Sequence, residues 1–387
     1  MLIRVTWRRA GLALGALLLG GVLFAWSGLF NIAASGGHWA VTEWALHWVM
    51  RNSVRTRALL VEAPPPLDSP ALRARGAGHY ASGCAPCHGA PGEPQNPIVQ
   101  RSTPSPPDFS DSLDEWSSRQ LFRIVQHGVR YTGMPGWIEP ARRDEVWAMV
   151  ALLEALPDMG PEEYRRLAYG EEAPRRARGA AAGMDGLSTP PPDLLADCAR
   201  CHNRDGRGRD GAAFPVIAGQ NEAYLLQALR AFAGGSRHSG IMQPPATRAG
   251  DAALQALAAH YAAQPRAPVR QTFDPALLAA GENIARQGLP ESQVPACLSC
   301  HGGAALRRNP SWPRLEGQHA AYLEGQLALW RDGVRGGGPF ANVMQTIGER
   351  LTPDQARAVS AWFAAGGGGE GGDRASHGEA REGLAPP

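Results

Sequence analysis

The chain has 387 residues, a formal net charge of +2 at pH 7 and 44% hydrophobic residues. This length is too great for one small core and predicts two to four domains. The small net charge excludes the broad basic field that nucleic-acid binding requires, so we expect no nucleic-acid partner. Every basic residue is Arg, which we attribute to composition bias because Ala, Gly and Pro are also abundant.

The N-terminal segment carries Arg4, Arg8 and Arg9, followed by an uncharged run over residues 10–30. As a helix rising about 1.5 Å per residue, this run would reach roughly 31 Å and cross a bilayer. The positive-inside rule keeps the arginines cytoplasmic and places the rest of the chain outside the inner membrane. A cleaved signal peptide is the alternative, but the run exceeds the usual cleaved core of about 7–15 residues. We therefore expect a retained anchor.

The next segment, residues 38–50, has helical spacing, with Trp44 and Trp48 one turn apart. An amphipathic helix at the membrane interface and a helix packed on the first globular domain both fit this pattern. Residues 63–66 follow as Ala-Pro-Pro-Pro, which indicates a stiff spacer. Residues 1–67 are thus predicted to form the membrane anchor and an interfacial helix.

All six cysteines fall in three copies of one pattern, C-x-x-C-H. This is the attachment sequence for c-type haem. The two thiols add to the two vinyl groups of one haem, and the imidazole of the next residue ligates the iron. The chain is therefore predicted to bind three covalent haem c groups through Cys84, Cys87, His88, Cys198, Cys201, His202, Cys297, Cys300 and His301.

Other uses of a C-x-x-C pair fit the sequence less well. A zinc site takes four protein ligands from two nearby pairs, whereas these pairs are far apart and each has its own His. A thioredoxin-like redox pair would need a βαβ context, which the sequence does not show. A disulfide scaffold would not need a His after every second Cys.

A first haem domain is predicted over residues 68–170. Ser69-Pro70 fits the start of a helix that leads through Gly76 to Cys84. A second helix follows Asp144 and stops before Pro157, with apolar residues at core spacing. Helix, haem motif, irregular loop and final helix together resemble class I cytochrome c. In that family the first and last helices cross at a glycine where an aromatic side chain packs close, and Gly76 is our candidate.

The resemblance implies a sixth iron ligand from the loop before the last helix. Residues 131–135, Tyr-Thr-Gly-Met-Pro, match the methionine loop of the family, so Met134 is the expected ligand. A thioether is a soft ligand that suits haem iron and raises its potential. Met149, Met159 and His127 are alternatives, although Met149 lies inside the predicted helix and is expected to pack in the core.

Residues 171–191 lack apolar periodicity and are predicted to be a linker. Beyond them the sequence repeats, because residues 214–220 are echoed by residues 312–318 at an offset of 98. Two haem domains in tandem resemble the dihaem cytochrome c4 class. This implies domains at 192–267 and 268–366, and a polar tail at 367–387 is expected to be disordered.

Each repeat holds one methionine, Met242 or Met344, before its final helix. We expect these two to ligate the second and third irons, with His238 as a close alternative to Met242. Residues 352–355, Thr-Pro-Asp-Gln, predict the start of the last helix through a capping box.

The resemblance also implies a role for prolines that follow the proximal histidines. In the family such a proline offers its carbonyl oxygen to the second imidazole nitrogen and orients the ring. Pro215 and Pro313 are in this position. The first domain has no clean equivalent, since Pro94 and Pro97 come early.

The predicted fold is therefore all-α, with three class I cytochrome c domains behind one transmembrane helix. Three irons with His on one side and Met on the other leave no open position, which favours electron transfer over enzyme catalysis. We expect a relay on the periplasmic side of the inner membrane that serves a terminal oxidase. Its redox partners would be an oxidase, a dehydrogenase or a quinol-oxidising complex.

Two other functions compete with this relay. One is the cytochrome subunit of a periplasmic alcohol or sugar-acid dehydrogenase, which genomic neighbours or co-purifying subunits would identify. The other is a dihaem peroxidase, which would require an iron without a methionine ligand or with a switchable one.

Overall fold

The computed structural model describes residues 6–33, 36–109, 113–170, 192–209, 213–266 and 271–368. Within these ranges every regular element is a helix, with three isolated β-bridges as the extended pairing. This helical architecture agrees with the all-α expectation. The predicted linker at 171–191 and residues 369–387 of the predicted tail lie outside the described residues.

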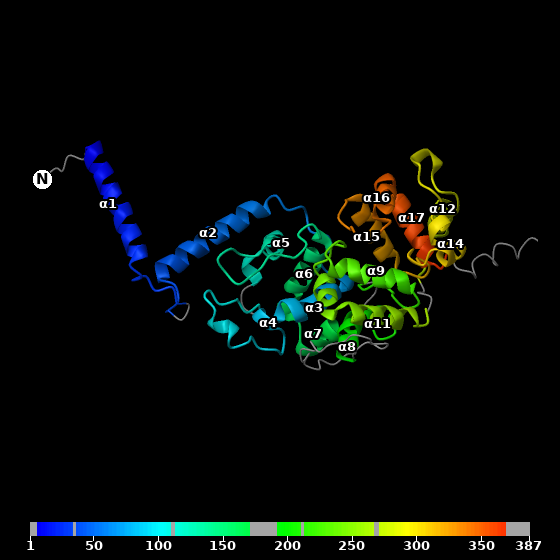
Figure 1. The fold of residues 1–387 in the computed structure, drawn as a ribbon, viewed down its shortest axis with the longest axis horizontal. Helices are drawn as coiled ribbons and strands as arrows, with labels where there is room; N and C mark the ends of the chain where they lie inside the picture. Colours follow the sequence, from blue (N-terminus) through cyan, green and yellow to red (C-terminus); the bar gives the residue numbers. More distant parts are fainter. Residues whose placement is uncertain are drawn as a thin grey trace, which may run out of the picture.

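Helix α1 (Trp7–Trp26) stands apart from the packed helices, at the N-terminal end of the molecule (Figure 1). Its mean hydropathy is 1.7 and none of it is buried, so by length and composition it could cross a membrane. The apolar run continues to Phe30, but the helix ends at Trp26 because Ser27 caps it and Gly28 takes a φ of +71°.

Helix α2 (Ala40–Ala58) combines features of both predicted alternatives. Trp44 and Trp48 stack with ring centroids 6.3 Å apart and remain exposed. Farther along, the helix packs on α5 (Ser118–His127), and Arg51 pairs with Glu115 in the turn that precedes α5. One part of α2 is therefore attached to α5 while its indole-bearing part is exposed.

The first unit is organised around the crossing of α3 (Pro70–Gly83) and α6 (Arg143–Ala155). A Cβ at Gly76 would collide with the carbonyl oxygen of Ala148 and lie 2.9 Å from Leu152 Cβ. The close crossing at Gly76 is confirmed, with backbone of α6 and not an aromatic ring as its neighbour. Helices α4 (Ala85–His88) and α7 (Pro161–Tyr169) complete this unit.

The core of the first unit is apolar and largely aromatic. Tyr80, Phe122 and Trp147 are buried together, and Phe122 and Trp147 have ring centroids 4.3 Å apart. Burying one such side chain contributes about 1.5–3 kcal/mol. This packing fixes α5 against α6 and so positions the loop between them.

The remaining helices form two similar groups. Helix α9 packs on α11 as α15 packs on α17, and α12 crosses α17 at Gly281. The capping box predicted at Thr352 is confirmed, since Gln355 N donates to Thr352 Oγ1 at 3.2 Å and Thr352 N donates to Gln355 Oε1 at 2.9 Å. The bounds are α8 (Pro192–His202), α9 (Glu222–Ala233), α10 (Gln243–Ala249), α11 (Asp251–Ala262), α12 (Pro275–Gln287), α13 (Leu298–His301), α14 (Gly303–Arg308), α15 (Ala320–Arg331), α16 (Ala341–Arg350) and α17 (Pro353–Ala364), with short 3₁₀ turns at Val99–Arg101, Leu113–Glu115, Leu156–Asp158 and Pro290–Ser292.

A reciprocal set of amide hydrogen bonds joins these two groups. Gln220 Nε2 donates to Arg314 O at 2.9 Å, and Arg314 N donates to Gln220 Oε1 at 2.7 Å. Gln318 makes the same pair with Val216, at 2.8 and 2.9 Å. The two sets are related by the 98-residue offset of the repeat. The echoed Gly-Gln of the sequence is therefore an interface element with approximate two-fold symmetry.

Candidate functional site

A continuous cavity of about 3220 Å³ runs through the packed helices. Pockets for one small molecule have volumes of about 300–1,000 Å³, so this cavity has room for several ligands. It brings together all twelve residues predicted to hold haem. These are Cys84, Cys87, His88, Met134, Cys198, Cys201, His202, Met242, Cys297, Cys300, His301 and Met344.

The second and third motif histidines are oriented by backbone carbonyls. His202 Nδ1 lies 3.4 Å from Pro215 O, and His301 Nδ1 lies 2.9 Å from Pro313 O. Both prolines were expected in this role, and the structure confirms it. An Nδ1–H that donates to a carbonyl leaves the Nε2 lone pair as the atom able to bind a metal.

The first motif histidine has the same arrangement through a proline that the sequence did not identify. His88 Nδ1 lies 3.0 Å from Pro107 O, 19 residues farther along the chain. The expectation that this domain lacks an equivalent is therefore corrected. Its loop is longer than the 12- and 13-residue spacings of the other units, and Phe109 stacks on the His88 ring at 4.2 Å.

Burial keeps these imidazoles neutral. It lowers the pKa of His202 to about 4, and it also lowers the pKa values of His88 and His301. A neutral imidazole is the form that ligates a metal. The free cysteines that line the cavity and the oriented rings thus fit a covalently attached haem at each motif.

The three predicted methionine ligands lie on segments that precede α6, α11 and α17. Met134 is in the loop between α5 and α6, where its N–H donates to Thr132 Oγ1 at 3.1 Å. Met242 caps the N-terminus of α10, and Met344 lies in the first turns of α16. All three methionines line the cavity.

The four alternative ligands differ in their placement, since Met149 and His238 line the cavity whereas Met159 and His127 do not. Met149 and Met159 belong to the apolar core of the first unit and are 1% and 7% exposed. His127 is exposed and does not line the cavity. His238 reaches the cavity, and its Nδ1 lies 2.9 Å from Val334 O, so this contact leaves its Nε2 able to bind a metal, as in the motif histidines.

Two buried arginines in the cavity wall were missed by the sequence reasoning. Arg237 stacks on Phe232 and Arg335 on Trp330, each with its guanidinium carbon 4.5 Å from the ring centroid. Both donate to Tyr224 Oη at 3.4 Å, and neither is paired with an acidic side chain of the described residues. The two arginines are 98 residues apart, which is the offset of the repeat, and this spacing could have identified them from the sequence. Two buried cations of this kind suit carboxylate groups of a ligand.

Comparison with known proteins identifies relatives for two parts of this arrangement. A family model described as cytochrome c oxidase, cbb3-type, subunit III matches residues 71–153. A thiosulfate dehydrogenase electron acceptor from Thiomonas intermedia (strain K12) is 39% identical over 175 residues, which are 45% of this chain and 80% of that protein. Cytochrome c4 of Pseudomonas aeruginosa is 32% identical over 47% of this chain and 92% of its own length.

Among solved structures, reduced recombinant cytochrome c4 from Pseudomonas stutzeri has 30% sequence identity and a TM-score of 0.41. The match covers 44% of this chain and 94% of that one. The first two relatives share more than 30% identity over most of their own lengths. The chain therefore belongs to the cytochrome c family, as an electron-transfer protein related to cytochromes c4 and to thiosulfate dehydrogenase electron acceptors.

Proposed function

We propose that the chain is a membrane-anchored cytochrome with three haem c groups that relays electrons on the periplasmic side of the inner membrane. The observation that carries this proposal is the convergence of six cysteines, three histidines and three methionines on one cavity. Each haem would belong to one unit, at residues 68–170, 192–267 and 268–366. In this proposal no iron has an open position for a substrate.

Bound haem supplies one-electron transfer, and the protein determines how that capacity is used. The motif cysteines would hold the group, and a neutral imidazole with its Nδ1 tied to a proline carbonyl would face one side of it. Met134, Met242 and Met344 would close the other side and exclude small molecules. Arg237 and Arg335 would neutralise carboxylates of the group at the interface of the second and third units.

The membrane part of the proposal is supported by residues 1–67. Helix α1 is apolar and unburied, and arginines precede it. The exposed Trp44 and Trp48 of α2 are the side chains that membrane interfaces favour. Helix α2 would thus lie along the periplasmic surface and tether the first haem unit to the bilayer.

For the electron acceptor, the family matched by residues 71–153 favours a terminal oxidase. For the donor, the names of two relatives favour a dehydrogenase that oxidises thiosulfate, and not an alcohol or sugar acid. The second candidate function is therefore the electron acceptor of a thiosulfate dehydrogenase, which is compatible with the same relay.

The direct experiment mixes the oxidised holoprotein with purified thiosulfate dehydrogenase and thiosulfate, and records reduction of the haem absorption bands. A parallel mixture uses an alcohol dehydrogenase of the periplasmic type and its substrate. Rapid reduction in the first mixture alone supports the thiosulfate route. Membranes that contain a terminal oxidase should then reoxidise the protein, and failure to do so contradicts the oxidase as acceptor.

A further inference from the structure

The first unit contacts the second one directly at its haem-attachment motif. A Cβ at Gly78 of α3 would lie 3.0 Å from Cys201 Sγ and 3.3 Å from Phe214 Cζ. Arg200 Nη2, from the same motif, donates to Gly78 O at 2.9 Å. The absence of a side chain at Gly78 therefore lets α3 lie against the cysteine that would hold the second haem.

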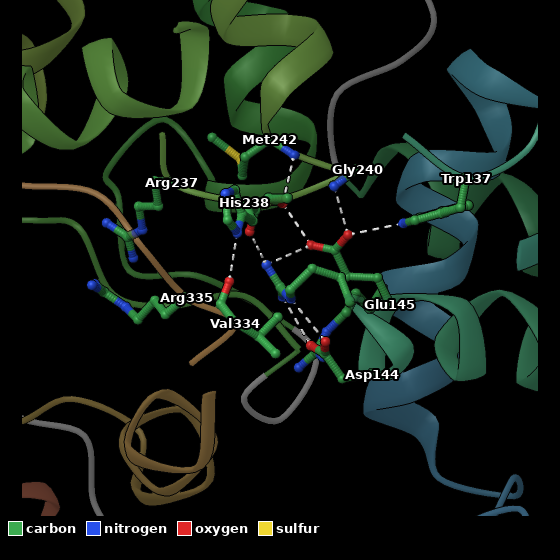
Figure 2. A network of polar contacts seen from close by, with 12 residues as sticks. Trp137, Asp144, Glu145, Arg237, His238, Gly240, Met242, Val334 and Arg335 are labelled. Atoms are coloured by element: carbon green, nitrogen blue, oxygen red, sulfur yellow. Dashed lines mark hydrogen bonds and ion pairs between the residues drawn. The ribbon is translucent and has the colours of Figure 1, made fainter. Parts of the chain in front are cut away.

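A second contact is made by Glu145 of α6, whose side chain is 2% exposed (Figure 2). Its Oε1 accepts from Ser239 Oγ at 2.5 Å and lies 2.9 Å from Arg142 Nη1. Its Oε2 accepts from Gly240 N at 2.7 Å and from Trp137 Nε1 at 3.1 Å. Four donors surround this buried carboxylate, two of them from the second unit.

The same donors belong to the segment that carries Met242. Ser239 Oγ, which donates to Glu145, also accepts from Met242 N at 3.0 Å. Arg142 Nη1 donates to His238 O at 2.6 Å. Residues 238–242 are thus bound at several backbone and side-chain atoms by groups of the first unit.

There is no space for this segment to move toward the first unit. A Cβ at Gly240 would collide with the indole nitrogen of Trp137. Trp137 is itself buried and fixed by its hydrogen bond to Glu145. The backbone of Gly240 and the Trp137 ring are therefore in close contact at this point.

We infer that Glu145 is a positioning residue for Met242, so that the first unit holds the sulfur ligand on the second haem. This inference rests on the proposed function, because it assumes a haem at Cys198 and Cys201. Met242 is anchored through one hydroxyl, Ser239 Oγ, to a carboxylate of the preceding unit. The second iron then keeps its methionine only while the first unit is docked.

The expected size of the effect follows from the bonds involved. Hydrogen bonds to a buried charge are stronger than neutral ones, and removing one leaves its donors unsatisfied. Glu145→Gln keeps the side-chain volume but removes the charge and places an amide N–H₂ toward one set of donors. We expect the fraction of second haem without methionine to rise about tenfold or more.

The experiment uses the full-length holoprotein with Glu145→Gln, and Glu154→Gln on the exposed face of the same helix as control. Carbon monoxide is added to the reduced proteins, and its binding is counted per chain from the haem spectrum. Glu145→Gln should bind carbon monoxide at up to one haem and weaken the far-red methionine–iron band of the oxidised protein. Glu154→Gln should match the unsubstituted protein.

A second variant, Ser239→Ala, breaks the same link from the other unit and should give the same carbon monoxide binding. If the Glu145→Gln protein does not accumulate in cells, the Ser239→Ala protein tests the inference in its place. In a Met242→Ala background, where the second haem already binds carbon monoxide, neither substitution should add further binding.

The inference is overturned if Glu145→Gln and Ser239→Ala lower the melting temperature but leave carbon monoxide binding and all three midpoint potentials unchanged. It is also overturned if extra binding persists in the Met242→Ala background, since another haem would then be affected. The intact mass of each variant, which reports how many haems are attached, separates these results from failure of the proposed function. A chain without haem at Cys198 and Cys201 contradicts the proposed function itself.

Discussion

The crossing of α12 and α17 gives a prediction whose magnitude comes directly from the structure. A Cβ at Gly281 would collide with the carbonyl oxygen of Ala358 and lie 2.8 Å from Trp362 Cβ. Gly281→Ala gains about 0.5–1 kcal/mol from helix propensity, but overpacking costs about 1–3 kcal/mol. We expect a net loss of roughly 0.5–2 kcal/mol in the free energy of unfolding of this unit.

A matched control lies in the same unit, at Gly325 of α15. A Cβ there meets no other atom of the chain within 4 Å, so Gly325→Ala should stabilise the helix by about 0.5–1 kcal/mol. Both variants are compared with the unsubstituted holoprotein by guanidinium denaturation followed by circular dichroism. If Gly281→Ala is as stable as Gly325→Ala, the argument that Gly281 exists to allow the close crossing is wrong.

Three further predictions concern the ligands and the anchor. Met344→Ala should produce a high-spin signal and carbon monoxide binding at one haem, and a spectrum that stays low-spin would show that another residue ligates the third iron. Arg335→Gln removes a buried cation near the second and third haems, so one midpoint potential should fall in a potentiometric titration; three unchanged potentials would contradict the carboxylate-binding role. Replacement of residues 1–33 by a cleavable signal should give protein that is soluble without detergent, whereas release of the full-length protein from membranes by salt alone would contradict the anchor.

The features that the sequence predicted are those set by local chemistry. Two thiols and an imidazole must have a fixed spacing to attach one haem, so each C-x-x-C-H motif is recognisable without a structure. Gly76 and the capping box at Thr352 are also local signals, and both were confirmed. The helix predicted after Asp144 and before Pro157 corresponds to α6 (Arg143–Ala155), whereas α5 was not predicted.

Other features depend on contacts between distant residues and were not predictable in this way. The carbonyl oxygen of Pro107 contacts His88 Nδ1 across a longer loop than in the other units. The spacing between motif and proline seen in the other units therefore did not identify it. Glu145 meets Ser239 from 94 residues away, and no local pattern marks a buried carboxylate inside an otherwise apolar helix face. For Arg237 and Arg335 the repeat offset was a usable signal, because a residue retained in both repeats without a place in the haem motif indicates an interface.

The central claim is that three haem groups are covalently attached to one chain. Its most direct test is the intact mass of the purified holoprotein under denaturing conditions, followed by peptide mapping. We predict the mass of the polypeptide plus three haems, with one haem on each of the peptides that contain Cys84 and Cys87, Cys198 and Cys201, and Cys297 and Cys300. A mature protein with fewer than three covalent haems would contradict the account.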